Sequence, residues 1–313
     1  MKNIMDNAAS NMKESLARSV IYSDFSLQVR VGVTGHRSLT GTPELVKSIK
    51  QALTTSLLEL LEPSSIYQRV VKKIFPRFYN ASLGKDRKTK VTFTVVSPLA
   101  EGADRLVAEE ALNLPNYSLE VVLPMMKEEY IQDFQTSESR EMFDSLLGRA
   151  ARWDLIINRT LAEEIPDKDP NERRRVAYKR VGEYVVDHCD ILVALWDGQP
   201  SRGTGGTAEI VAYARKRGKS LIVISTVNPK KISIEKGNDS IGKTFSRMEM
   251  LNSFGIDQQV NRSYIENQYR EIFSTPEGTR LNQKNLENVK NNLLPWYVRA
   301  SIIAKKNQKI YLM

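Results

Sequence analysis

Residues 203–209 read GTGGTAE, in which three glycines and two threonines fill five consecutive positions before a helical pattern. Glycine allows turns that other residues resist, and amides at the start of a helix attract anions. Threonine hydroxyls can add hydrogen bonds to phosphate oxygens. The sequence therefore predicts a phosphate site, with Glu209 beside it, formed by Gly203, Thr204, Gly205, Gly206 and Thr207.

Trp196 and Asp197 stand just before this loop, at the end of an apolar segment. An indole ring can stack on a base, and a carboxylate can accept hydrogen bonds from a ribose or a base edge. Both side chains are therefore predicted to contact a nucleotide. The loop lacks the GK[ST] of a Walker A motif and comes too late in the chain for a dinucleotide-binding GxGxxG, so no cofactor is predicted.

Two other strand ends carry polar residues, in the segments TGHR (34–37) and SPLAEGAD (97–104). In the first segment the amides after Gly35, together with Arg37, could meet an anion. In the second, acidic residues suit the start of the helix that follows. Both segments could equally be ordinary turns between a strand and a helix. The candidate binding residues in them are Gly35, His36, Arg37, Ser97, Glu101, Gly102 and Asp104.

Short runs rich in Val, Ile and Leu predict the strands that position these loops, at 29–35, 90–98, 118–124, 189–196 and 220–226. Amphipathic helical patterns follow the first, second and fourth runs. Strands that alternate with helices favour a doubly wound, mainly parallel α/β sheet of the Rossmann-like kind. Such sheets bind ligands at the carboxyl ends of their strands, where all three loops should lie.

The remaining segments are predicted to lie outside the sheet. The predicted division is an N-terminal extension (1–28), a nucleotide-binding domain (29–226), a loop-rich connector (227–257) and a C-terminal helical segment (258–313). Within the domain, residues 62–89 are predicted to form a basic surface insertion, and the polar stretch 159–174 a mobile loop.

Composition limits the kind of protein. A net charge of +9 fits an anionic partner or simply a solvated basic surface. Cys189 is the single cysteine and the two histidines are far apart, so neither a disulfide framework nor a metal site is predicted. No signal-peptide pattern and no long apolar span occur, which favours a cytoplasmic protein.

The segments VGVTGHR, SPLAEGADRLVAEEA, LPMMKEEYIQDF, VGEYVVDHCDILVALWDG and GTGGTAEIVAYAR together resemble the SLOG superfamily, over about 29–226. That fold is shared by the DNA-processing protein DprA and the LOG cytokinin-activating enzymes. The greatest likeness is to SLOG sensors of bacterial anti-phage and nucleotide-signalling systems. The resemblance implies binding of a small messenger, a cyclic nucleotide or an ADP-ribose derivative, and regulation of an effector.

Two alternatives come from the same superfamily. In the LOG branch a glutamate at the position of Glu209, together with an arginine, cleaves nucleoside monophosphates, but this chain has SRGTGGTAE instead of PGGxGTxxE. No arginine matches the catalytic one by motif; the candidates by charge alone are Arg37 and the cluster Arg173, Arg174 and Arg175. DprA-like binding of nucleic acid would suit the net charge and the stretch KKIFPRFY (72–79), although nucleic acid is the less expected partner. Glu209 is therefore predicted to contact the ribose or to cap the loop, and not to cleave the ligand.

Assembly is predicted from the end of the chain. Apolar residues recur at helical spacings in 280–313, and such a stretch needs a covering surface. Residues 293–313 resemble the approach to the membrane helices of SLATT-type proteins, which often follow SLOG sensors. We expect a homo-oligomer and a possible membrane-spanning effector module, so that the full system could be membrane-associated.

Overall fold

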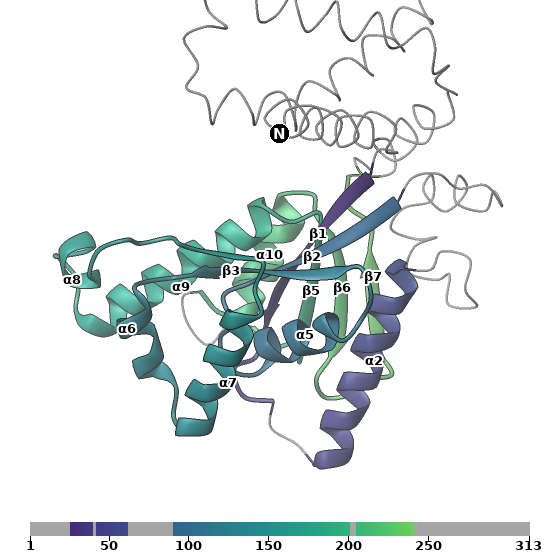
Figure 1. Ribbon diagram of the computed structural model, residues 1–313, viewed down its shortest axis with the longest axis horizontal. Coiled ribbons are helices and arrows are strands. Elements are labelled where there is room, and N and C mark those ends of the chain that lie inside the picture. The colour runs from purple at the N-terminus through teal and green to yellow at the C-terminus, as the bar shows by residue number, and fades with distance from the viewer. Residues whose placement is uncertain are drawn as a thin grey trace, which may run out of the picture. The chain divides into compact units, whose positions relative to one another are not determined.

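In the computed structural model, a seven-stranded sheet forms the core of the described residues (Figure 1). The structure describes residues 26–39, 42–61, 90–200 and 205–238, together with Ile241 and Thr244. The strands are β1 (Ser26–Gly35), β2 (Lys90–Ser97), β3 (Tyr117–Leu123), β4 (Arg152–Leu155), β5 (Ile191–Trp196), β6 (Ser220–Ser225) and β7 (Ile232–Glu235). Their order is β4-β3-β2-β1-β5-β6-β7, and every neighbouring pair is parallel except β6 and β7. The predicted doubly wound, mainly parallel α/β fold is confirmed.

The order of the strands reverses between β1 and β5. From β1 the chain adds β2, β3 and β4 on one side, and β5 then returns to the other side of β1. Val31, at the middle of β1, pairs with Val95 of β2 and with Ile191 of β5 and is fully buried. Because the connections after β1 and β5 leave in opposite directions, a crevice opens at the carboxyl ends of these two strands.

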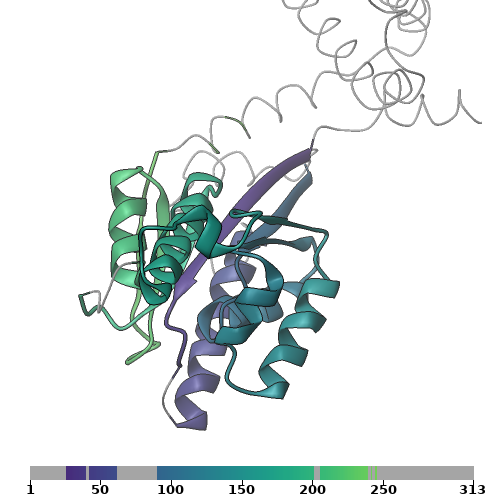
Figure 2. The ribbon, with the colours of Figure 1, turned by 90° about the vertical axis from the view of Figure 1, so that its left-hand side faces the viewer.

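Helices cover both faces of the sheet (Figure 2). The helical elements are α2 (Pro43–Leu61), α5 (Ala103–Leu112), α6 (Lys127–Tyr130), η1 (Ile131–Asp133), α7 (Ser137–Gly148), α8 (Leu161–Glu164), α9 (Pro170–Asp187) and α10 (Thr207–Lys216). Helices α9 and α10 lie on one face, and α2 and α5 on the other. None of the helices in the described ranges is long and apolar enough to cross a membrane.

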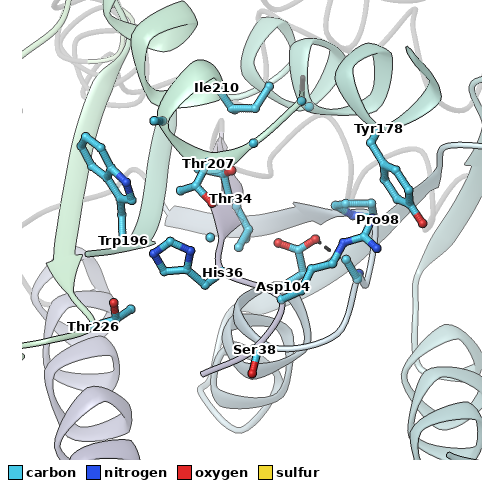
Figure 3. A pocket seen from close by; sticks show the side chains of 18 of the residues that line it. Thr34, His36, Ser38, Pro98, Asp104, Tyr178, Trp196, Thr207, Ile210 and Thr226 are labelled. Atoms are coloured by element: carbon cyan, nitrogen blue, oxygen red, sulfur yellow. Dashed lines mark hydrogen bonds between the residues drawn. The ribbon is translucent and has the colours of Figure 1, made fainter. Parts of the chain in front are cut away.

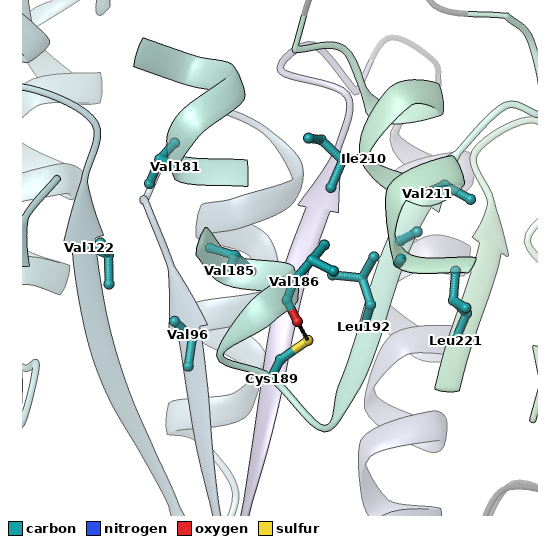
Figure 4. Packing of buried hydrophobic residues seen from close by; sticks show 12 residues of the cluster. Val96, Val122, Val181, Val185, Val186, Cys189, Leu192, Ile210, Val211 and Leu221 are labelled. Atoms are coloured by element: carbon teal, nitrogen blue, oxygen red, sulfur yellow. Dashed lines mark hydrogen bonds between the residues drawn. The ribbon is translucent and has the colours of Figure 1, made fainter. Parts of the chain in front are cut away.

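The face under α9 and α10 carries one continuous apolar core (Figure 4). Val181 and Val185 of α9 pack with Ile210 of α10 above Leu192 of β5. Gly182 lets the two helices approach closely, because a Cβ at that position would overlap the Ile210 side chain. Burial of these apolar side chains, each worth about 1.5–3 kcal/mol, holds both helices over the crevice.

The structure differs from the sequence-based expectations at its edges. Strands β4 and β7 were not predicted, and β7 lies within the range expected to be a connector. Helix α9 begins inside 159–174, where a mobile loop was expected: Asp169 caps the amides of Asn171 and Glu172, and Pro170 occupies the first helical turn. Polar surface residues concealed this helix because its apolar positions lie on one side only.

Parts of the predicted division cannot be compared with the structure. Residues 1–25 of the predicted extension, the whole insertion 62–89 and the whole helical segment 258–313 lie outside the described residues. Strand β1 begins at Ser26, within the range predicted to be the extension.

Candidate functional site

A cavity of about 730 Å³ occupies the crevice at the carboxyl ends of β1 and β5 (Figure 3). Its floor is formed by residues 33–39, from the end of β1 and the loop after it, and by residues 196–200, from the end of β5 and the loop after it. Its walls come from α9, from the first turn of α10 and from the start of α5. A volume of this size accommodates a ligand as large as a nucleotide.

The loop after β1 is held against the start of α5 by two glycines. A Cβ at Gly102 would overlap the carbonyl oxygens of His36 and Arg37, and one at Gly35 would overlap the Cβ of Ala103. Gly102 also has a φ of +79°, which disfavours any other residue. The amide of Ala103 donates to His36 O at 3.0 Å. Gly102 therefore places His36 and Arg37 without lining the cavity itself.

His36 joins the loops that follow β1 and β5. Its Nε2 lies 3.1 Å from both the amide nitrogen and Oδ1 of Asp197, 161 residues away in the sequence. Trp196 presents its ring to the cavity, and its indole N–H donates to Gln199 O at 3.0 Å. The ring is therefore fixed in a position where a planar group in the cavity can pack against it.

The first turn of α10 faces the cavity without a side-chain cap. Its N-cap is Gly206, which supplies no side-chain acceptor, and Gly206, Thr207 and Ala208 line the cavity. Gly205 has a φ of +78°, and a Cβ there would lie 3.0 Å from the amide nitrogen of Lys179. Uncapped amides at the N-terminus of a ten-residue helix favour an anion.

Glu209 points to a different partner. Its carboxylate accepts the Gly205 N–H at 2.7 Å and pairs with Lys179 Nζ at 2.7 Å. These contacts lower the pKa of Glu209, Lys179 more strongly than the amide. Glu209 does not line the cavity. Because it contacts both the Gly205 amide and Lys179 of α9, it holds the loop at Gly205 against that helix.

The wall formed by α9 is cationic, and its arginines belong to the cluster 173–175 that the sequence offered as candidates by charge only. Arg174, Arg175 and Tyr178 line the cavity. Arg174 pairs with Asp133 at 2.7 Å, whereas Arg175, with a side chain that is 59% exposed, lies 3.7 Å from Glu172. The sequence held a signal in the helical spacing of the lining positions in NERRRVAYKRVGEYV, once Asp169-Pro170 is taken as a helix start.

Arg37 crosses the cavity toward this wall. Its guanidinium lies 3.9 Å from the centre of the Tyr178 ring, a cation–π contact. Tyr178 also contacts Asp133 through its hydroxyl, and Asp133 in turn pairs with Arg174. Within the described ranges no carboxylate forms an ion pair with Arg37, so its charge remains available to a ligand.

Asp104 is a buried acid in the cavity wall, with 6% of its surface exposed. Its Oδ2 accepts the Ala100 N–H at 3.3 Å. Burial raises the pKa of Asp104 to about 7, although the Ala100 amide and the charges of Arg37 and Arg105 act in the opposite direction. A group of this kind exchanges a proton near neutral pH, unlike an ordinary aspartate.

The structure thus brings together most of the predicted site residues. The cavity is lined by Gly35, His36, Arg37, Asp104, Trp196, Asp197, Gly205, Gly206 and Thr207. Four others lie elsewhere: Ser97, Glu101, Gly102 and Glu209. Gly203 and Thr204 lie outside the described residues.

Ser97 and Glu101 have structural partners. The buried Ser97 hydroxyl accepts the Leu99 N–H at 3.1 Å, which supports a turn where Leu99 has a φ of +59°. Glu101 turns toward α7, where its carboxylate accepts from the Ser139 hydroxyl and from the Gln135 N–H at 3.3 Å. Both therefore shape the loop before α5. Among the described residues, no group of three acidic, His or Cys side chains could hold a metal ion.

Comparison with known proteins gives likeness in fold only. The sequence matches no described protein family and no curated protein. A structure of DNA processing protein A (DprA) from Streptococcus pneumoniae is similar with 12% identity and a TM-score of 0.34, covering 76% of this chain and 64% of that chain. The Helicobacter pylori DprA, described for its single-stranded DNA binding mode, is similar with 14% identity and a TM-score of 0.36, covering 81% and 84%. The chain therefore spans less than two thirds of the S. pneumoniae structure.

Proposed function

We propose that the cavity binds a nucleotide through its phosphate groups. The supporting observation is that the uncapped first turn of α10 and the guanidinium of Arg37 face one cavity at the switch between β1 and β5. Both are donors that phosphate oxygens accept. Trp196 supplies a ring for the base, and Asp197 an acceptor for a ribose or base edge.

The distribution of charge favours a small ligand in this cavity. The described ranges 26–39, 42–61, 90–200 and 205–238 hold 24 lysines and arginines against 25 aspartates and glutamates. The excess positive charge of the chain therefore lies in other segments. Asp104, Asp133 and Asp197 also line the cavity, which would repel the successive phosphates of a long polyanion.

Binding without cleavage is the form of this function that the site supports better. The carboxylate of Glu209 is occupied by Lys179 and the Gly205 amide and does not face the cavity. Messenger sensing, control of an effector, oligomerisation and a place in anti-phage defence rest on the SLOG resemblance alone. Incubation with AMP and chromatography for free adenine test the alternative: release of base at many turnovers, abolished in Glu209→Gln, would establish hydrolysis.

Calorimetric titration with AMP, ADP-ribose and cyclic dinucleotides tests the proposal. Arg37→Gln removes the cation that faces the cavity, and Arg149→Gln removes an exposed arginine outside it. We expect Arg37→Gln to weaken binding by about 10- to 100-fold, the effect of losing a charged hydrogen bond. The control should bind like the parent. Absence of binding by all these nucleotides, or equal affinities of the two variants, would contradict the proposal.

Single-stranded DNA is a second candidate ligand. The observation that favours it is the segment 62–89, which has seven basic and two acidic residues and places aromatic residues among the cations of KKIFPRFY. Aromatic rings can stack on unpaired bases while the neighbouring cations contact the phosphates.

Fluorescence anisotropy with labelled oligothymidine tests this candidate. Binding through phosphates should weaken steeply between about 50 and 200 mM salt and in the double variant Lys72→Gln, Lys73→Gln. Arg37→Gln distinguishes the two sites: it should leave DNA affinity unchanged if DNA uses 62–89 and reduce it if DNA enters the cavity. No binding at physiological salt would remove the candidate.

A further inference from the structure

Asp104 lies in the cavity wall near Arg37 and Arg105, and neither arginine forms an ion pair with it in the described part of the chain. Arg105 directs its guanidinium elsewhere: Nε donates to Leu99 O at 2.9 Å and Nη1 to Ser139 O at 2.7 Å. Arg37 is held by the Tyr178 ring. The Asp104 carboxyl accepts one amide hydrogen bond at 3.3 Å.

Three ionisable groups interact with the charge of Asp104: Arg37 after β1, Arg105 on α5 itself and Tyr130 on α6. Other charged and titratable groups line the same cavity from the neighbouring elements: His36 after β1, Asp133 on η1, Arg174 and Tyr178 on α9, and Asp197 after β5. Tyr130 is fully buried and its hydroxyl has no hydrogen-bond partner in the described structure. The carboxyl group therefore lies in a polar but incompletely paired environment, where its charge is poorly solvated.

An anion in the cavity shifts the protonation equilibrium of the Asp104 carboxyl group. Without a ligand, the nearby positive charges partly offset the cost of burial, and the pKa of Asp104 is about 7. A phosphate group that engages Arg37 adds negative charge to the same low-dielectric space and offsets the charge of that arginine. Both changes favour the neutral form of the acid, and the proton it takes up comes from solvent.

We propose that Asp104 is a proton-linked specificity residue of the anion pocket, which takes up one proton when a phosphate-like oxyanion binds. The proposal rests on the proposed phosphate-binding function. It assigns the site a preference for oxyanions at the lower end of the neutral pH range. At higher pH the ionised carboxylate opposes them by repulsion.

Sulfate is the probe that tests this, because its charge does not change between pH 6 and 8.5. Equilibrium dialysis at constant ionic strength measures its affinity for the full chain. We expect the affinity to fall on the order of 10-fold or more from pH 6 to 8.5, since two like charges close together in a partly buried site repel strongly. Asp104→Asn, which imitates the neutral acid, should bind at pH 8.5 nearly as tightly as the parent at pH 6.

His36→Gln is the matched control, because His36 also carries an ionisable side chain that lines the cavity. The ratio of its sulfate affinities at pH 6 and pH 8.5 should equal that of the parent, whatever its absolute affinity. Calorimetry of the unmodified chain in buffers of different ionisation enthalpy supplies a second measurement that needs no variant. Net proton uptake of roughly 0.3–0.8 per sulfate is expected near pH 7.5.

The outcomes separate the two proposals. Sulfate binding with no pH dependence, with no proton uptake, or with a pH dependence that persists in Asp104→Asn would overturn the role of Asp104 alone. Failure of sulfate to bind at any pH would overturn the phosphate site as well. Loss of the pH dependence in His36→Gln would assign the proton to the histidine instead.

Discussion

Replacement of Gly102 by alanine tests whether close packing of the loop after β1 holds the cavity in shape. The new Cβ would overlap two carbonyl oxygens of that loop, and the φ of +79° is itself unfavourable for alanine. Backbone strain of this kind costs about 1–3 kcal/mol. Overpacking against backbone atoms that cannot rotate away costs about 1–3 kcal/mol more. We therefore expect Gly102→Ala to lower the free energy of unfolding by about 2–6 kcal/mol.

The free energies of unfolding are measured by urea unfolding followed by circular dichroism. Alanine variants of two other glycines serve as controls that separate the effect of packing from that of backbone strain. Gly198 has a φ of +85° but nothing within 4 Å of a Cβ, so Gly198→Ala should show the strain alone. Gly148, at the end of α7, also has open space, and Gly148→Ala should be neutral or stabilising by up to about 1 kcal/mol. If Gly102→Ala were no less stable than Gly198→Ala, the reasoning about packing would be refuted.

Three further predictions concern buried titratable groups. Glu120→Gln should destabilise the fold by about 1–3 kcal/mol in urea at pH 7, because Arg30 and Arg152 both lose their carboxylate partner; unchanged stability would contradict this. Cys189 should resist iodoacetamide at pH 8 until the protein unfolds, since burial raises the pKa of its thiol to about 12; rapid native labelling would refute it. Asp104, with a pKa of about 7 when folded and about 3.9 when unfolded, holds an extra proton in the folded state between these values. Stability should therefore fall as pH rises from about 4 to 7, by up to about 4 kcal/mol, and Asp104→Asn should lose that slope; an unchanged slope would contradict the assignment.

The buried strands were predictable because their signal is local. Each of β1, β2, β3, β5 and β6 is a short apolar run that ends at turn residues, and the structure places all five within a few residues of their predicted bounds. Strands β4 and β7 escaped prediction because they are four residues long and carry polar side chains at the edges of the sheet.

The candidate site was predictable where it follows from the ends of parallel strands. His36, Arg37, Trp196 and Asp197 come directly at or after β1 and β5, and parallel neighbours bring their carboxyl ends together. The wall from α9 was missed because its contribution depends on which face of a polar helix is covered, and that face is chosen by packing on β5 and α10.

The amino-acid sequence by itself therefore determined the strand and helix periods, the glycine-rich loop and the edge of the sheet at which polar residues gather. The tertiary structure decided which of those residues share the cavity. It turned Glu209 toward Lys179, pressed Gly102 against the loop after β1 and buried Asp104 beside arginines engaged elsewhere. The physical reason is distance along the chain: hydrophobic period and turn chemistry act over a few residues, whereas burial, ion pairing and pKa depend on atoms supplied by segments as far apart as 161 residues.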